Sequence, residues 1–167
     1  MQTMEQTLEM CAPQVDAIGA SVNEWNDLYC LGYGATYAMA LEGALKLKEI
    51  TYAHCEGMLS TEFKHGPLSA VTKGFPILFA VGPQDVPLIV SGVNEVTCRG
   101  ARAIAIGEED ARLRANASDL IILPKSTPEI APLLAVLPLQ LLSYHMSVMR
   151  GFDPDFPRNL SKTLTVD

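Results

Sequence analysis

Hydrophobic residues recur at spacings of three and four along residues 3–24, which is the periodicity of an amphipathic helix. Pro13 lies inside this pattern, and we expect it to kink or divide the helix because proline lacks a backbone N–H. A second helix is expected at 33–52, after a glycine-bearing turn. Two more are expected at 86–99 and 129–150, the last interrupted in pattern by Pro132 and Pro138.

Short, continuous runs of apolar residues predict buried strands. The predicted strands are 27–32 (DLYCLG), 75–82 (FPILFAVG), 101–107 (ARAIAIG) and 118–124 (SDLIILP). Between the first two lies the stretch 55–74, which is broken up by Gly57, Gly66 and Pro67. We expect a long connection there that holds at most one short helix.

Strands alternate with helices, and the strands are uniformly apolar instead of alternating with polar positions. This pattern is typical of a parallel sheet covered on both faces. We therefore expect an α/β fold with a doubly wound, open, parallel sheet of four or five strands, similar to flavodoxin. Such sheets bind ligands at the carboxyl ends of their strands. The expected single domain comprises an N-terminal helix (1–26), the α/β core (27–150) and an extended tail (151–167).

Composition supports one well-packed domain without a nucleic-acid or membrane partner. The 167 residues are 49% hydrophobic and 19% charged, which is enough apolar material for a core. The net charge of −7 disfavours non-specific nucleic-acid binding, which needs a basic face. We see no apolar run of the ~18 residues that a membrane span requires. The polar, acidic start MQTMEQTLEM is unlike a signal peptide, so we expect a cytoplasmic protein.

The sequence predicts neither a metal site nor a nucleotide cofactor. The four cysteines (Cys11, Cys30, Cys55 and Cys98) form no CxxC pair and no zinc-like cluster with histidine, so we interpret them as free thiols. The segment GYGATYA has only two glycines of the dinucleotide-binding fingerprint GxGxxG, and no Walker A motif is present.

The segment EGALKLKE (42–49) is the first that could carry chemistry. On a helix Glu42, Lys46 and Glu49 share one face, while Lys48 points elsewhere. One interpretation is a solvated face with salt bridges. The other is a carboxylate base held beside an amine, with pKa values set by these neighbours.

Histidines and the terminal lysine give further candidates. His65 precedes a Gly-Pro turn in a loop, which suits an acid/base residue better than a core position does. His145 lies on the apolar C-terminal helix and is interpreted as a core or interface residue, whereas His54 is left undecided. Lys162, in the partly apolar ending RNLSKTLTVD, is either an exposed lysine or a nucleophile toward a carbonyl.

Three stretches together resemble one family. They are LGYGATYAMALEGALKLKEITYAHCEG, EFKHGPL and PLQLLSYHMSVMRGFDPDFPRNLSKTLTVD. They are similar to the C-terminal sugar-isomerase (SIS) domain of glutamine–fructose-6-phosphate aminotransferases, also called glucosamine-6-phosphate synthases. The resemblance runs from about residue 27 to the end, although 82–117 matches only in pattern. Its family converts fructose 6-phosphate into glucosamine 6-phosphate with ammonia from glutamine.

The resemblance implies a role for each matching residue. Lys162 would form a Schiff base with the ketose carbonyl, in a tail that closes over the sugar. Glu49 would move a proton between C1 and C2, and Lys46 would assist proton transfers at the substrate oxygens. His65 would act in ring opening at the site of a neighbouring subunit. Glu42 belongs to the same polar stripe and would have a supporting role in binding the substrate.

The chain also departs from this family pattern. The family's glutaminase begins with a catalytic cysteine after Met removal, but Gln2 follows Met1 here. The family's phosphate-binding Ser/Thr loops belong to the first SIS domain, and the corresponding loop reads AVGPQD without serine. We therefore expect the second half of an isomerase module, either cut from a longer chain or encoded separately, that does little alone.

Its expected partners are the missing glutaminase and first SIS domains, sugar phosphates, and a second copy in a homodimer. Other interpretations remain open. One is a related SIS enzyme, such as a fructosamine-phosphate deglycase or a sugar-phosphate deaminase/isomerase. Another is a non-catalytic sugar-phosphate sensor or dimerisation module.

Overall fold

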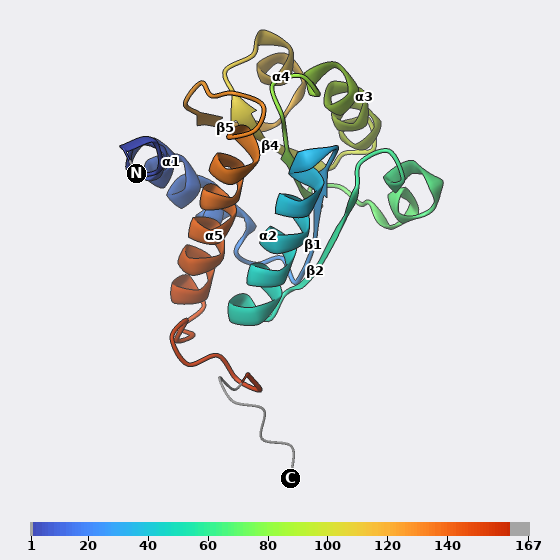
Figure 1. Cartoon of the computed structure of the whole chain (residues 1–167). Helices are drawn as coiled ribbons and strands as arrows, with labels where there is room; N and C mark the ends of the chain where they lie inside the picture. The colour runs from blue at the N-terminus through green and yellow to red at the C-terminus, as the bar shows by residue number, and fades with distance from the viewer. Residues whose placement is uncertain (1, 161–167) are drawn as a thin grey trace.

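A five-stranded sheet lies at the centre of the computed structural model, which describes residues 2–160 (Figure 1). The helices of the chain and its two short 3-10 turns surround the strands. The strands are β1 (Asp27–Gly32), β2 (His54–Leu59), β3 (Pro76–Ala80), β4 (Arg102–Glu108) and β5 (Asp119–Leu123). The helices are α1 (Gln2–Val22), α2 (Ala35–Thr51), η1 (Phe63–His65), η2 (Pro67–Ala70), α3 (Val86–Thr97), α4 (Ala111–Asn116) and α5 (Ala131–Met149).

All neighbouring strands are parallel, and their order is β2-β1-β3-β4-β5. The chain moves from β1 to β2 on one side and then returns to place β3 on the other side of β1. The order of strands therefore reverses between β1 and β3. This is the doubly wound topology that the sequence predicts, with its switch point at the carboxyl ends of those two strands.

The sheet separates two apolar cores. On one side α1, α2 and α5 cover it, and on the other side α3 packs with η1 and α4 (Figure 1). Successive residues of a strand belong to opposite cores. In β3, Leu78 and Ala80 pack on the side of α2 and α5, while Ile77 and Phe79 pack on the side of α3. Because both faces are covered, the inner strands are apolar at almost every position, as expected of a parallel sheet.

Helix α1 runs continuously through Pro13, so the expected division of this helix does not occur. Its buried face includes Cys11, Val15 and Val22, all without exposed area. Packing of this face against α5 and β5 holds the helix together across the missing backbone hydrogen bond.

Helix α5 is, within the described part of the chain, the one helix whose length and composition would allow it to cross a membrane. No such segment is expected from the sequence, because polar residues interrupt the apolar run. In the fold more than half of this helix is buried, against α1 and α2 in particular. Its apolar character therefore serves the domain core.

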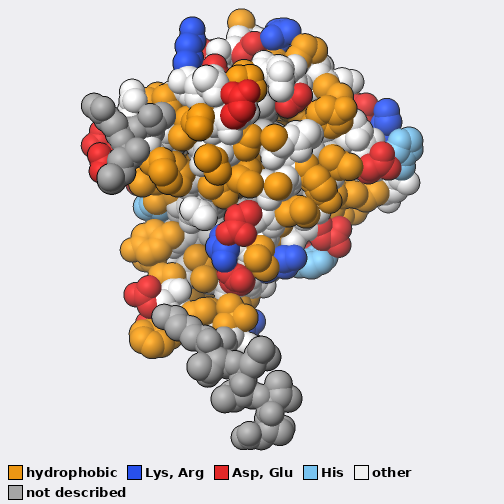
Figure 2. All heavy atoms as spheres, viewed as in Figure 1, with side chains coloured by type: hydrophobic (Ala, Val, Ile, Leu, Met, Phe, Trp, Pro, Cys, Tyr) orange, Lys and Arg blue, Asp and Glu red, His pale blue; other side chains and the backbone are white. Residues whose placement is uncertain are grey.

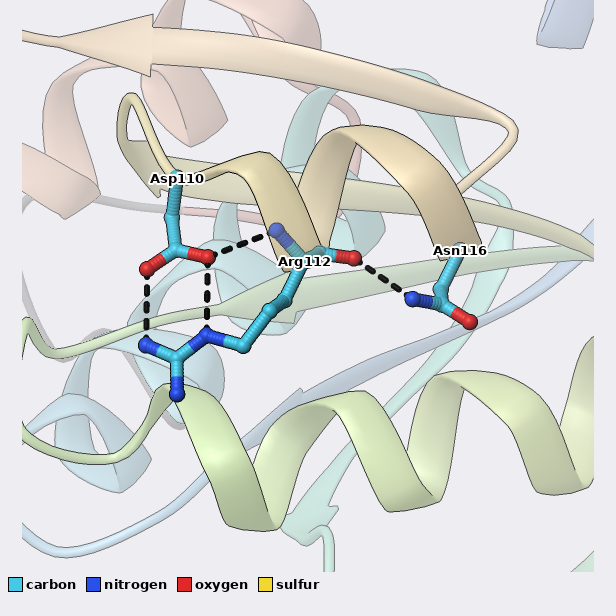
Figure 3. Close-up of polar contacts among 3 residues, drawn as sticks. All are labelled: Asp110, Arg112 and Asn116. Atoms are coloured by element: carbon cyan, nitrogen blue, oxygen red, sulfur yellow. Dashed lines mark hydrogen bonds and ion pairs between the residues drawn. The ribbon is translucent and has the colours of Figure 1, made fainter.

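Three elements were not predicted: β2, α4 and one of the two 3-10 turns η1 and η2, since at most one short helix was expected in 55–74. The stretch 55–59 belongs to β2 instead of a loop, and Glu56 and Gly57 break its apolar pattern because this strand lies at the edge of the sheet. Helix α4 is only six residues long. Its signal was Asp110, whose carboxylate accepts the backbone N–H of Arg112 at 2.8 Å and also binds the guanidinium (Figure 3).

Close packing of α2 against α5 depends on Gly43. A Cβ built at this position would lie 2.7 Å from Cδ1 and 3.0 Å from Cβ of Leu139. The two helices are therefore closer than any larger residue at position 43 permits.

We predict that Gly43→Ala lowers the free energy of unfolding by about 1–3 kcal/mol, because the added methyl group overpacks the contact with Leu139. This result would oppose the intrinsic preference of helices for alanine. Gly92→Ala on α3 is the control, since its Cβ would meet Phe79 at an ordinary 3.5 Å. Urea denaturation of both variants checks the prediction, and equal stabilisation by both would contradict it.

Candidate active site

Three charged residues form a stripe along the outer side of α2. The inner side of this helix is fixed by the buried residues Ala40, Gly43, Ala44, Leu47 and Thr51. With that side against α5 and the sheet, Glu42, Lys46 and Glu49 must face outward. Their side chains are 35%, 32% and 26% exposed, so the stripe is partly sheltered.

Lys46 and Glu49 form the tightest pair of the stripe. The Lys46 Nζ donates a hydrogen bond of 2.6 Å to Glu49 Oε2 and lies 3.7 Å from Glu42 Oε1. The hydrogen bond to Glu49, aided by the charge of both carboxylates, raises the pKa of Lys46 above its ordinary value, against a smaller effect of burial. Lys46 therefore remains a cation near neutral pH, able to donate a proton or a hydrogen bond but unsuited to act as a base.

A cavity of about 490 Å³ opens beside Glu49. On one side it is lined by the last turns of α2 and by the residues that follow, up to His54. On the other side it is lined by Arg158, Asn159 and Leu160 from the C-terminal tail. The fold thus brings the tail, which is more than 100 residues away in sequence, next to the Lys46–Glu49 pair. Lys162 itself lies outside the described residues.

Arg150 fixes the start of this tail. Its guanidinium donates to the backbone carbonyls of Asn23, Trp25 and Thr51, and the shortest contact to each is 2.5–2.9 Å. Burial lowers the pKa of Arg150, although not enough to remove its charge. This role of Arg150 was not predicted from the sequence, where the only signal is an arginine directly after an apolar helix.

The structure separates His65 from the Lys46–Glu49 pair. His65 belongs to η1, which follows the carboxyl end of β2, whereas Glu49 lies near the opposite end of that strand, close to His54. The strand alone spans about 20 Å at the usual rise per residue. Within one chain the two residues therefore do not form one site. The side chain of His65 is exposed.

The other histidines have local partners. His145 Nδ1 lies 2.6 Å from Asp16 Oδ1 and joins α5 to α1, as expected of a core or interface residue. His54 lies 3.4 Å from Asp27 and 3.6 Å from Glu56, and it is two-thirds exposed. Among residues 2–160 no group of three His, Cys, Asp or Glu side chains is arranged to hold a metal ion.

The loop after β3, at the switch point of the sheet, is poorly suited to bind phosphate. It holds Asp85, and burial raises the pKa of this carboxyl group. The side chain of Asp85 also fills the space over Gly82, where an added Cβ would lie 2.5 Å from Asp85 Oδ2. Serine or threonine hydroxyls do not occur in this loop (82–85).

Comparison with known proteins identifies the family to which this architecture belongs. The family model of the SIS domain matches residues 21–150. The chain belongs to the SIS domain family. A solved structure described as the C-terminal domain of glucosamine-fructose-6-phosphate aminotransferase from Francisella tularensis superimposes with a TM-score of 0.84 at 34% identity. The match covers 91% of this SIS domain and 44% of that chain.

Curated relatives carry the name glutamine–fructose-6-phosphate aminotransferase [isomerizing]. The relative from Methanothermobacter thermautotrophicus is 46% identical over 157 residues, which is 92% of this chain and 26% of the relative. The relative from Rhizobium meliloti is 39% identical over 168 residues, 98% of this chain and 28% of the relative. This SIS domain therefore spans about a quarter of the length of the relatives it matches.

We predict that Glu49→Gln lowers the pKa of Lys46 toward its ordinary value, because the variant loses the charged acceptor. Since the raised pKa means that the native state holds this proton more tightly, the pair stabilises the fold fully below pH ~10. That contribution is lost as the pH rises through the pKa of native Lys46. NMR titration of the lysine side chains checks this, with Glu56→Gln as the control. An unchanged Lys46 pKa in Glu49→Gln would show that the pair is not formed in solution.

Proposed function

We propose that this chain is the second SIS half of an isomerase module that makes glucosamine 6-phosphate from fructose 6-phosphate and ammonia released from glutamine. The observation that carries the proposal is the cavity shared by Glu49 and the tail. Leu160 lines that cavity, and two residues of chain can extend by only about 7 Å. Lys162 follows Leu160 by two residues, and the proposal assigns it to this cavity.

The residue types fit the proposed steps. The Lys162 amine adds to the C2 carbonyl of the open ketose, and loss of water gives a Schiff base. Ammonia then takes the place of the lysine nitrogen at C2, which frees Lys162. Glu49 removes a proton from C1 and a proton is returned to C2, so that C1 becomes the aldehyde of the amino sugar. Lys46, held as a cation, donates to the substrate oxygens, and Glu42 supports its position.

The remainder of the substrate site must come from elsewhere. Asp85 and the absence of hydroxyls in the loop 82–85 argue against phosphate binding at the switch point of this domain. We propose that the first SIS domain holds the phosphate and that the glutaminase domain supplies ammonia, with both in the missing three-quarters of the relatives' length. The exposed His65, placed away from Glu49, would serve the site of a second subunit in a homodimer.

The surface offers an area for such partners. Leu41, Leu45, Leu133, Tyr144 and Val148 are 42–54% exposed on α2 and α5, and Figure 2 shows hydrophobic side chains across this face of the molecule. An exposed apolar patch of this kind marks a protein–protein contact. We propose a cytoplasmic enzyme without a cofactor, formed as a single domain (1–167) with an N-terminal helix (1–26), an α/β core (27–150) and a catalytic tail (151–167).

A related SIS isomerase is the second candidate. The tagatose-6-phosphate ketose/aldose isomerase of Escherichia coli is 26% identical and superimposes with a TM-score of 0.67. An isomerase would need the proton transfer by Glu49 but would not incorporate ammonia.

The test mixes this chain with a relative whose second SIS domain has been deleted, and then assays glucosamine 6-phosphate. We predict that the mixture is active and that Lys162→Ala and Glu49→Gln each lower the rate by about 100-fold or more. Borohydride should trap a sugar adduct at Lys162 in Glu49→Gln but not in Lys162→Ala.

Three outcomes would count against the proposal. A folded, inactive complex would contradict the aminotransferase. Interconversion of sugar phosphates without use of ammonia would favour the isomerase. Sugar-phosphate binding that is unchanged by Glu49→Gln, with no trapped adduct, would indicate a sensor.

A further inference from the structure

Tyr52 ends α2 in a conformation that tyrosine rarely adopts. Its φ of 59° and ψ of 15° are left-handed, and it is one of two non-glycine residues with positive φ in the described chain. Helices commonly end in this conformation, but with glycine, which adopts it without steric cost. A strained residue in such a place points to a role for its side chain.

The side chain of Tyr52 contacts the C-terminal tail. Its ring packs edge-on against Phe152, with the ring centroids 4.7 Å apart. The guanidinium carbon of Arg158 lies over the ring, 4.0 Å from its centroid. The backbone N–H of Arg158 donates to the Tyr52 hydroxyl at 3.0 Å. The side chain of Tyr52, at the end of α2, therefore contacts the tail at two residues, Phe152 and Arg158, which are six positions apart.

We propose that Tyr52 is a positioning residue that latches the tail over the end of α2 and so sets the position of Lys162. Tyr52 follows Glu49 by three residues and lines the same cavity as Glu49 and Leu160. Arg158, which the ring and the hydroxyl hold, precedes Lys162 by four residues. The latch thus connects the lysine to the helix that carries the Lys46–Glu49 pair. Its catalytic consequence rests on the proposed role of Lys162.

A helix end that merely needed a left-handed residue would not produce these contacts. Glycine would satisfy the backbone there, and it could neither stack on Arg158 nor accept its N–H. Arg150 anchors the start of the tail independently, through carbonyls of Asn23, Trp25 and Thr51. Tyr52 is thus the second attachment, closer to the lysine, and its loss should free the end of the tail without detaching its beginning.

The first experiment measures the latch without any chemistry. Trypsin can cut the tail after Arg158 and Lys162, and mass spectrometry follows release of the terminal peptides. We expect Tyr52→Gly to speed release about tenfold, because it removes both the cation–π contact and the hydrogen bond. Tyr52→Phe keeps the ring and should speed release by only about threefold. The melting temperature of the rest of the domain should not fall in either variant.

Tyr144→Ala is the matched control, because Tyr144 is half exposed on α5 and packs beside His145 instead of the tail. It should leave release at the wild-type rate. Equal release from wild type and Tyr52→Gly would overturn the proposal. So would the same acceleration in Tyr144→Ala, since the effect would then be general destabilisation.

The second experiment connects the latch to Lys162. Borohydride trapping with fructose 6-phosphate, in the mixture of this chain with the relative that lacks its second SIS domain, should give about tenfold less adduct at Lys162 in Tyr52→Gly, with partial recovery in Tyr52→Phe. If wild type forms no adduct, the proposed role of Lys162 fails while the trypsin result still decides the latch. If wild type and Tyr52→Gly form equal adduct, the latch does not position the lysine and the proposal is wrong.

Discussion

The packing of α2 between the sheet and α5 determines where every part of the candidate site lies. Gly43 allows Leu139 to approach closely, and the buried face from Ala40 to Thr51 leaves one orientation for the helix. That orientation turns Glu42, Lys46 and Glu49 outward as one stripe. It also ends the helix at Tyr52, where the tail returns, so a shift of this helix would move the charged pair and the tail attachment together.

The site is chemically one-sided. It has a carboxylate, a cation held by it and a tail that leads to a second amine, all near one end of α2. The loop 82–85 at the switch point of the sheet holds no hydroxyl group, and Asp85 occupies the place where such sheets often bind anions. His65 lies beyond the carboxyl end of strand β2, away from the Lys46–Glu49 pair. These features are what a half-module would show, since its other groups would be supplied by neighbouring domains or a second subunit.

How far the sequence predicts the structure depends on whether the signal is local. The inner strands β1, β3 and β4 are covered on both faces, and their apolar runs revealed them; β5, at the other edge, was found because its run DLIIL is uninterrupted. Edge strand β2 was missed because Glu56 and Gly57 interrupt its run. The Lys46–Glu49 pair was predicted, since a spacing of three on a helix guarantees proximity. The contact of Arg158 with Tyr52 joins residues 106 positions apart, and no periodicity in the sequence indicates such a contact.

Paramagnetic relaxation measured by NMR tests most directly whether the tail lies over the end of α2. A nitroxide label would be attached to Lys162→Cys in a Cys98→Ser background, because Cys98 is exposed while the other three cysteines are buried. We predict strong broadening of the amide signals of Glu49 and Ala53, and little at Val93, which lies on the buried face of α3. Equal or negligible broadening at all three would show that the tail does not bring residue 162 to the Lys46–Glu49 pair.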